Sequence, residues 1–393
     1  MIYRNKDFYE KIKSGPTPIT DDTTFLNLTK SGAITDETLL EIFSDLRLGI
    51  GKNLKLDNIC FLMGNGCSIY AGSKSTLDFK MSDALDSDVY SNIEDIDKHI
   101  SGKPLEEQLN DLLTIRDYYH IMRDSKETII SDVITALKKY LLSNYVNSVK
   151  YKELSLHEIL FLKLRSFGCL NKVKLYTPNY DLALEYVLDK LSIEYADGFT
   201  GFVNRKFDPR SLERGNSVRL IKFHGSVNWV YDSDENAIKE VQPNFSTDGK
   251  VEVEDAEHVL IYPTEQKLYQ TYNAPYSELM RNMLDGFEAK RNVIFVLGYK
   301  YGDEHINEIL VKALTNPNNV FCFFDYGGGT KGSCDFVDRI IKLSESTSNI
   351  NVLLGSFLGD FATFVKYMLP ATEEKTDQER LLELLNKVMS HGV

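Results

Sequence analysis

Four clusters of glycines and polar side chains each follow a short apolar run, and they hold the residues of this chain best suited to chemistry. The first cluster, Gly64-Asn65-Gly66-Cys67-Ser68, comes after the run 59–63. A glycine turn at the end of a buried strand points backbone amides outward, and such amides attract phosphate groups. The cluster therefore predicts nucleotide binding through Gly64, Gly66, Cys67 and Ser68. A hairpin is the simpler alternative, but residues 67–73 lack the alternating polarity of a second strand.

The second cluster, Thr177-Pro178-Asn179-Tyr180-Asp181, follows the apolar run 173–176. Asn179 both donates and accepts hydrogen bonds, so its amide suits a ribose hydroxyl, a carboxamide or an attacking water. We expect Asn179 to take part in the chemistry. For Asp181 two compatible roles stay open, a contact with the ligand and a cap on the helix predicted to follow it.

His224 and Gly225 form the third cluster, at the end of the run 219–223. A neutral imidazole near pH 7 is the common general base of enzymes, and we expect His224 to be one. The fourth cluster, Gly298-Tyr299 with Asp303, follows the run 292–297. Gly298 would let the backbone approach a ligand, while Asp303 would cap a helix whose amino end favours anions.

Seven short apolar runs rich in Val, Ile and Phe predict strands that are buried on both faces, and helical periodicity separates most of them. This alternation predicts an α/β fold, a Rossmann-like doubly wound parallel sheet. The carboxyl ends of parallel strands share one edge, so the four clusters should meet there. The predicted strands are 58–63, 173–176, 219–223, 259–262, 292–297, 320–324 and 351–354.

Helical segments are expected to flank and interrupt this sheet. Residues 1–57 look partly helical, residues 58–370 would form the Rossmann-like domain, and residues 371–393 predict a charged amphipathic helix. A helical insertion is expected over about 75–150, because apolar residues recur there at helical spacing. It would leave the sheet at the edge where ligands bind. The acidic region 232–257 predicts an exposed hairpin or loop.

Composition and charge exclude several classes of protein. Of the 393 residues 42% are hydrophobic, so the chain can fill a sizeable core and is not disordered. Its 45 Lys and Arg against 58 Asp and Glu give a net charge of −13, which disfavours direct binding of nucleic acid. Neither a GxGxxG fingerprint nor a Walker A loop occurs, which disfavours an ordinary dehydrogenase and an enzyme that hydrolyses ATP. No apolar stretch is long enough for a membrane helix, and the five cysteines include no CxxC pair. We therefore expect a cytoplasmic protein whose cysteines are reduced.

The order of the four clusters over residues 59–325 resembles the sirtuin family of NAD-consuming enzymes, and more closely its divergent bacterial members that hydrolyse NAD in antiphage defence. In sirtuins a glycine-rich turn cradles the pyrophosphate, a Thr-x-Asn-x-Asp segment holds the nicotinamide end, a His-Gly pair supplies the base, and a later glycine segment lines the cofactor. The segment 262–267 also looks like one of the defence members. The resemblance implies that Gly64, Gly66 and Ser68 cradle the pyrophosphate and that Thr177, Asn179 and Asp181 hold the nicotinamide end. It implies that His224 and Gly225 are the pair that supplies the base, and that Gly298 and Tyr299 line the cofactor.

The chain departs from the sirtuin deacylases in two ways. Their structural zinc needs two CxxC pairs, which this sequence lacks, so no zinc or other metal site is expected. Their acidic-aromatic-Arg segment after the first turn is not recognisable in 71–79. The resemblance therefore implies an NAD+ hydrolase, with NAD+ as its substrate and with nicotinamide and ADP-ribose as its products. Two alternatives stay open, an NAD-dependent protein deacylase and a non-catalytic sensor of NAD or ADP-ribose.

Free NAD hydrolysis would deplete a cell of NAD, so the resemblance also implies control. Relatives of this size resemble the NADase subunit that assembles with a hexameric HerA-type DNA-translocating ATPase. We therefore expect a homo-oligomer, and a possible hetero-complex with such an ATPase, that acts in antiviral defence by abortive infection. The acidic composition is consistent with leaving DNA contact to the partner.

Overall fold

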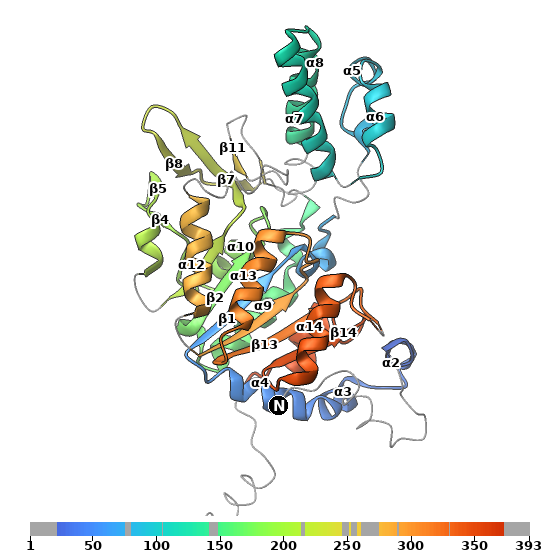
Figure 1. The fold of residues 1–393 in the computed structure, drawn as a ribbon. Helices are drawn as coiled ribbons and strands as arrows, with labels where there is room; N and C mark the ends of the chain where they lie inside the picture. Colours follow the sequence, from blue (N-terminus) through green and yellow to red (C-terminus); the bar gives the residue numbers. More distant parts are fainter. Residues whose placement is uncertain are drawn as a thin grey trace, which may run out of the picture.

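The centre of the molecule is a seven-stranded parallel sheet in the order β14-β13-β12-β1-β2-β6-β3. The computed structural model describes residues 22–74, 80–103, 105–140, 148–213, 217–245, 251–252, 258–260, 275–288, 291–329 and 331–372. Helices lie on both faces of the sheet, which confirms the predicted Rossmann-like α/β fold (Figure 1). The strands are β1 (Asn58–Met63), β2 (Val173–Thr177), β3 (Tyr195–Ala196), β6 (Val218–Lys222), β12 (Asn292–Leu297), β13 (Asn319–Asp325) and β14 (Ile350–Leu354).

The two central strands, β1 and β12, are buried along their whole length. Side chains alternate along a strand, so Phe61 and Met63 face one apolar core while Cys60 and Leu62 face the other. This is why the runs read as continuously apolar. The first core also contains residues of α3 (Asp36–Ile42), α4 (Ser44–Asn53), α9 (Ser155–Ser166) and α10 (Ala183–Lys190), and the second contains residues of α12 (Tyr276–Glu288), α13 (Glu304–Leu314) and α14 (Asp335–Ser346).

The chain changes direction across the sheet between β1 and β12. After β1 it builds β2 and β6 on one side, and it then returns to build β12, β13 and β14 on the other side. Such a reversal is a topological switch point, and ligands of open α/β sheets bind in the crevice beyond the carboxyl ends of the two strands that flank it. The turns after β1 and β12 are therefore the first place to look for a site.

A second, antiparallel sheet of five strands has the order β11-β7-β8-β5-β4. The run 259–262 is predicted as a strand of the parallel sheet, but its described residues 259–260 belong here, because β11 (His258–Leu260) pairs antiparallel with β7 (Gly225–Asp232). That prediction was wrong because an apolar run indicates burial but not the direction of its neighbour. The region 232–257, predicted as an exposed hairpin or loop, begins in the hairpin that joins β7 to β8 (Ala237–Glu240). The remaining strands are β4 (Phe199–Thr200) and β5 (Arg205–Phe207).

A group of helices follows the turn after β1, as the helical periodicity predicted. It comprises α5 (Ser87–Ser91), α6 (Glu94–Ile100), α7 (Leu105–Met122) and α8 (Lys126–Tyr140), and it projects away from the parallel sheet (Figure 1). These helices share a separate apolar core that includes Leu109, Leu112 and Val133. Most of the predicted C-terminal helix, residues 373–393, lies outside the described residues. Within the described ranges, no helix combines the length and the apolarity needed to cross a bilayer.

Candidate functional site

The turns after β1 and β12 pack directly against each other at the switch point. The Gly64 amide donates to the Leu297 carbonyl at 2.9 Å, and the Gly66 amide donates to the Gly298 carbonyl at 2.9 Å. A Cβ on Gly64 would lie 2.5 Å from the Gly298 oxygen, and one on Gly66 would lie 2.7 Å from Gly298 Cα. Gly298 itself has a φ of +60°, which glycine adopts without a steric penalty. The close approach of the two turns therefore requires glycine at all three positions.

Four amides of the turn 64–68, those of Gly64, Gly66, Cys67 and Ser68, are hydrogen-bonded within the protein. Besides Gly66, the Cys67 amide donates to the Gly64 carbonyl at 3.1 Å and the Ser68 amide donates to the Asn65 carbonyl at 2.9 Å. The turn thus differs from the bare phosphate cradle that the sequence suggested. Sequence reasoning missed this because one acceptor, the Gly298 carbonyl, comes from a strand far along the chain. The roles of Gly64, Gly66, Cys67 and Ser68 in binding stay predictions.

A small cavity lies between the β1 turn and the end of β2. Its volume is about 10 Å³, which is room for about one water molecule. The structure brings five of the predicted site residues to its wall, and it adds His157 from α9. The lining residues are Met63, Cys67, Ser68, His157, Thr177, Asn179, Asp181, Ala183 and Leu184.

Hydrogen bonds fix the segment that carries Asn179. The Thr177 hydroxyl donates to the Met63 carbonyl at 2.7 Å and accepts from the Asn179 amide at 3.0 Å, so it joins the ends of β1 and β2. Asp181 Oδ1 accepts from the Ala183 amide, the first amide of α10, at 2.9 Å, but the N-cap position belongs to Leu182, so Asp181 bonds the start of the helix without being its N-cap residue. Burial raises the pKa of the Asp181 carboxyl, and the Lys222 ammonium partly offsets that rise.

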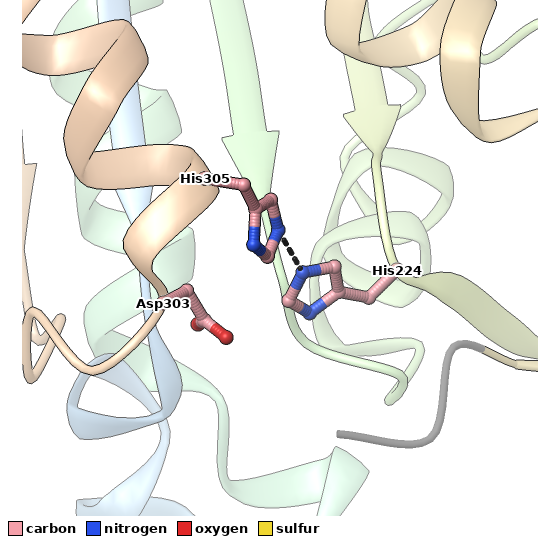
Figure 2. Close-up of side chains that lie close together, drawn as sticks. All are labelled: His224, Asp303 and His305. Carbon is pink, nitrogen blue, oxygen red and sulfur yellow. Dashed lines mark hydrogen bonds between the residues drawn. The ribbon is translucent and has the colours of Figure 1, made fainter. Parts of the chain in front are cut away.

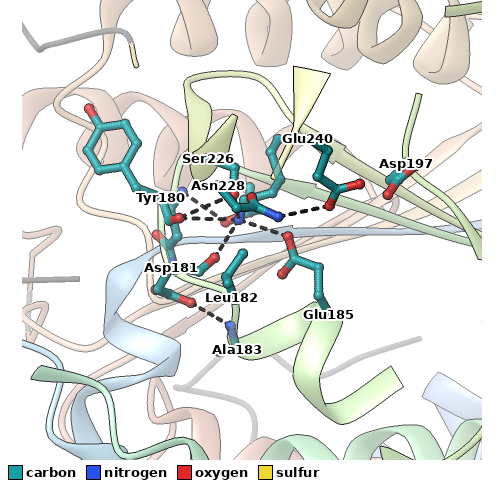
Figure 3. Close-up of polar contacts among 12 residues, drawn as sticks. Tyr180, Asp181, Leu182, Ala183, Glu185, Asp197, Ser226, Asn228 and Glu240 are labelled. Atoms are coloured by element: carbon teal, nitrogen blue, oxygen red, sulfur yellow. Dashed lines mark hydrogen bonds and ion pairs between the residues drawn. The ribbon is translucent and has the colours of Figure 1, made fainter. Parts of the chain in front are cut away.

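Lys222, the last residue of β6, is a buried cation that sequence reasoning did not find. It is 3% exposed, and its ammonium donates to the carbonyls of Tyr180 and Asp181, to the Ser226 hydroxyl at 2.7 Å and to Glu185 Oε1 at 2.8 Å (Figure 3). These contacts tie the segment after β2 to the segment after β6. A lysine at the end of a strand gives no signal of this role, because its partners come from elsewhere in the chain.

His224 lies beside the Asn179 segment, although it is not among the residues that line the cavity. The Phe223 amide donates to the Thr177 carbonyl at 3.2 Å, and the Val227 amide donates to the Tyr180 carbonyl at 3.1 Å, on either side of His224. Gly225, with a φ of +90°, turns the chain from β6 into β7. The predicted base and the predicted asparagine therefore stand at the ends of adjacent strands.

The His224 imidazole contacts a second histidine. Its Nε2 lies 3.0 Å from Nε2 of His305, and the carboxylate of Asp303 lies close to both rings (Figure 2). His224 is 3% exposed and His305 is 9% exposed. His305 was not predicted as a site residue, and the only signal for it is its position two residues after Asp303.

In the turn after β12, Asp303 differs from its predicted role as a helix cap, and Tyr299 bonds the Asp303 backbone. Asp303 occupies the N-cap position of α13, but its side chain makes no capping hydrogen bond, so the predicted cap is wrong in that detail. The Tyr299 side chain is buried, and its hydroxyl bonds the Asp303 amide and carbonyl, each at 3.2 Å. Tyr299 thus shapes the turn that presents Asp303.

The remaining titratable groups at the cavity are neutral. Burial, reinforced by the charges of Asp360 and Asp181, raises the pKa of the Cys67 thiol well above its ordinary value, so Cys67 is not a nucleophilic thiolate. Burial lowers the pKa of His157 to about 3, and its Nδ1 lies 2.8 Å from the Tyr70 hydroxyl. Cys67 and His157 therefore add no charge to the wall of the cavity.

Comparison with known proteins gives one family match. Residues 173–328 match the model of the SIR2-like domain, whereas no curated protein matches the chain. Among solved structures the chain is similar to a Sir2 homologue in complex with NAD, with 12% identity and a TM-score of 0.42 over 87% of this chain and 94% of that one. It is also similar to a mutant Sir2 homologue in complex with ADP-ribose, with 11% identity and a TM-score of 0.39 over 88% and 98% of the two chains. Over residues 173–328, which carry the clusters after β2, β6 and β12, this chain is thus similar to SIR2-like domains.

Proposed function

We propose that this protein hydrolyses NAD+ to nicotinamide and ADP-ribose. The observation that carries the proposal is the meeting of Asn179, His224 and the interlocked glycine turns at one edge of the sheet, beside the switch point. Dinucleotides bind at this edge in open α/β sheets. Most of these residues fall within the part of the chain that matches the SIR2-like domain, which supports an NAD-using site.

NAD+ hydrolysis requires mainly that the protein hold NAD+ and a water in the right positions. The nicotinamide of NAD+ is a pyridinium group, so it leaves the ribose as a neutral molecule and its departure needs no general acid. The site must orient a water and favour an oxocarbenium-like ribosyl centre. Asn179 would orient the water or the nicotinamide ribose, and His224 would accept the proton from that water or from a ribose hydroxyl.

The other predicted residues would hold the cofactor. Thr177 and Asp181 would border the nicotinamide end, the turn 64–68 would border the pyrophosphate, and Gly225, Gly298, Tyr299 and Asp303 would form the rest of the wall. The cavity admits about one water, so we expect bound NAD+ to widen it.

In the cell, such an enzyme would act by depleting NAD. We propose a cytoplasmic effector of antiphage defence that works as a homo-oligomer, with a HerA-type ATPase as a candidate partner. The net charge of −13 supports leaving any contact with DNA to that partner.

Product analysis separates the proposal from its alternatives. Purified protein is incubated with NAD+ alone, and the products are resolved by chromatography. We expect nicotinamide and ADP-ribose in equal amounts without any acyl peptide. A deacylase would release nicotinamide only when an acylated peptide is added, and a sensor would bind NAD+ saturably without turnover.

A further inference from the structure

We propose that His224, Asp303 and His305 form a binding site for a divalent transition-metal ion such as Zn²⁺, and that the bound ion stops the hydrolysis proposed above. Among the described residues, these three form the one group whose His and carboxylate ligand atoms all lie within 4.8 Å of one another (Figure 2). The second part of the inference rests on the proposed function, whereas the first part stands on the geometry alone.

The donor set and its spacing suit zinc. Imidazole nitrogen and carboxylate oxygen are common zinc ligands, at about 2.0–2.2 Å from the ion. In a tetrahedral site two such nitrogens lie about 3.3 Å apart. His224 Nε2 and His305 Nε2 lie 3.0 Å apart, so the two rings would separate by a few tenths of an ångström, and the Asp303 carboxylate, within 4.8 Å of both, would move closer to complete the site. Three protein ligands leave a fourth position for water.

Rigid elements position the three ligands. Asp303 and His305 stand at the N-cap and in the first turn of α13, so one helix end fixes their relative placement. His224 enters from the end of β6, where the turn at Gly225 directs the chain into β7. The Asp303 carboxylate occupies the N-cap without bonding a helix amide, and it lies close to both rings instead.

The histidine pair already depends on one shared hydrogen. At 3.0 Å, one Nε2 must donate and the other must accept, since two lone pairs would repel. A metal ion would take the place of that hydrogen, which would move to Nδ1 of its own ring, so that both Nε2 lone pairs bond the ion. It would therefore compete with the role of His224 as a proton acceptor.

The charge of the ion also opposes the reaction. Positive charge develops at the ribosyl centre as nicotinamide leaves, and a divalent cation at the base would repel it. We therefore expect the bound metal to inhibit turnover.

The test measures metal binding first and activity second. Protein freed of metal with a chelator is titrated with Zn²⁺ by calorimetry and with Co²⁺ by its visible absorption. We expect about one ion per chain. His305→Gln and Asp303→Asn each remove a ligand and should weaken binding by at least about 100-fold, at the upper end of the effect of losing an outer-shell partner. His120→Gln is the matched control, because His120 is exposed in α7.

Each outcome tests either the metal site or the inhibition by the bound metal. The metal site is supported if the His120→Gln variant binds the ion as the original protein does, while the His305→Gln and Asp303→Asn variants lose binding. Absence of binding to the original protein, or equal binding to all variants, overturns it. Binding that leaves NAD+ hydrolysis unchanged or faster overturns the inhibitory role. If the ion binds but no NAD+ is hydrolysed even with chelator present, the site stands and the proposed function fails.

Discussion

At the scale of single residues, Lys222 is the side chain on which the arrangement of the site most depends. Its ammonium is buried, and it bonds the carbonyls of Tyr180 and Asp181 while it pairs with Glu185 at 2.8 Å. Because the Tyr180 carbonyl follows Asn179 in the chain, this one cation fixes the loop that carries the predicted catalytic amide. A buried ion pair loses far more when one partner is removed than an exposed pair does.

We expect Lys222→Met to lower the free energy of unfolding by about 3–5 kcal/mol, since it leaves the Glu185 carboxylate buried without its cation. Urea denaturation measures the change. Lys190→Met is the matched control, because it removes a lysine that is 46% exposed in its pair with Glu158, and it should cost no more than about 1 kcal/mol. Equal losses in the two variants would show that Lys222 does not anchor the loop.

At the scale of elements, the site depends on the contact between the turns after β1 and β12. Both turns are short, and they meet through glycines whose backbones approach too closely for any side chain. The contact explains why two segments more than 200 residues apart both carry glycine directly after a buried strand. It also joins the two halves of the sheet at the switch point.

Gly64→Ala tests that contact. The new Cβ would meet the Gly298 oxygen at 2.5 Å, so we expect a loss of about 1–3 kcal/mol of unfolding free energy, measured by thermal or urea denaturation. Gly302→Ala serves as the control in the same region, because its Cβ would meet no atom within 4 Å, and its effect should stay within about 0.5 kcal/mol. A Gly64→Ala variant as stable as the Gly302→Ala variant would contradict the close packing.

At the scale of the whole molecule, the account depends on strand ends from four parts of the chain meeting at one edge. The apolar runs predicted β1, β2, β6 and β12, and parallel pairing then required their carboxyl ends to lie together. That much of the fold follows from local pattern and general rules of topology.

Features that depend on distant partners did not follow from the sequence. The direction of β11 depends on its pairing with β7, and the Gly66 amide donates to the distant Gly298 carbonyl. His305 becomes a candidate site residue only because its ring contacts His224. The role of Lys222 likewise depends on its hydrogen bonds to Tyr180, Asp181 and Glu185, which lie 37 to 42 residues earlier in the chain. Periodicity and spacing report burial and local turns, but they do not report which side chains meet across the fold.

The rate of nicotinamide release from NAD+ by Asn179→Ala and His224→Ala is the most direct test of this convergence. If the two residues act on one bound dinucleotide as proposed, each variant should be slower than the original protein by about 10²-fold or more, while circular dichroism shows an intact fold. The exposed His120→Ala variant should retain the original rate. Near-normal release by both Asn179→Ala and His224→Ala would contradict the account.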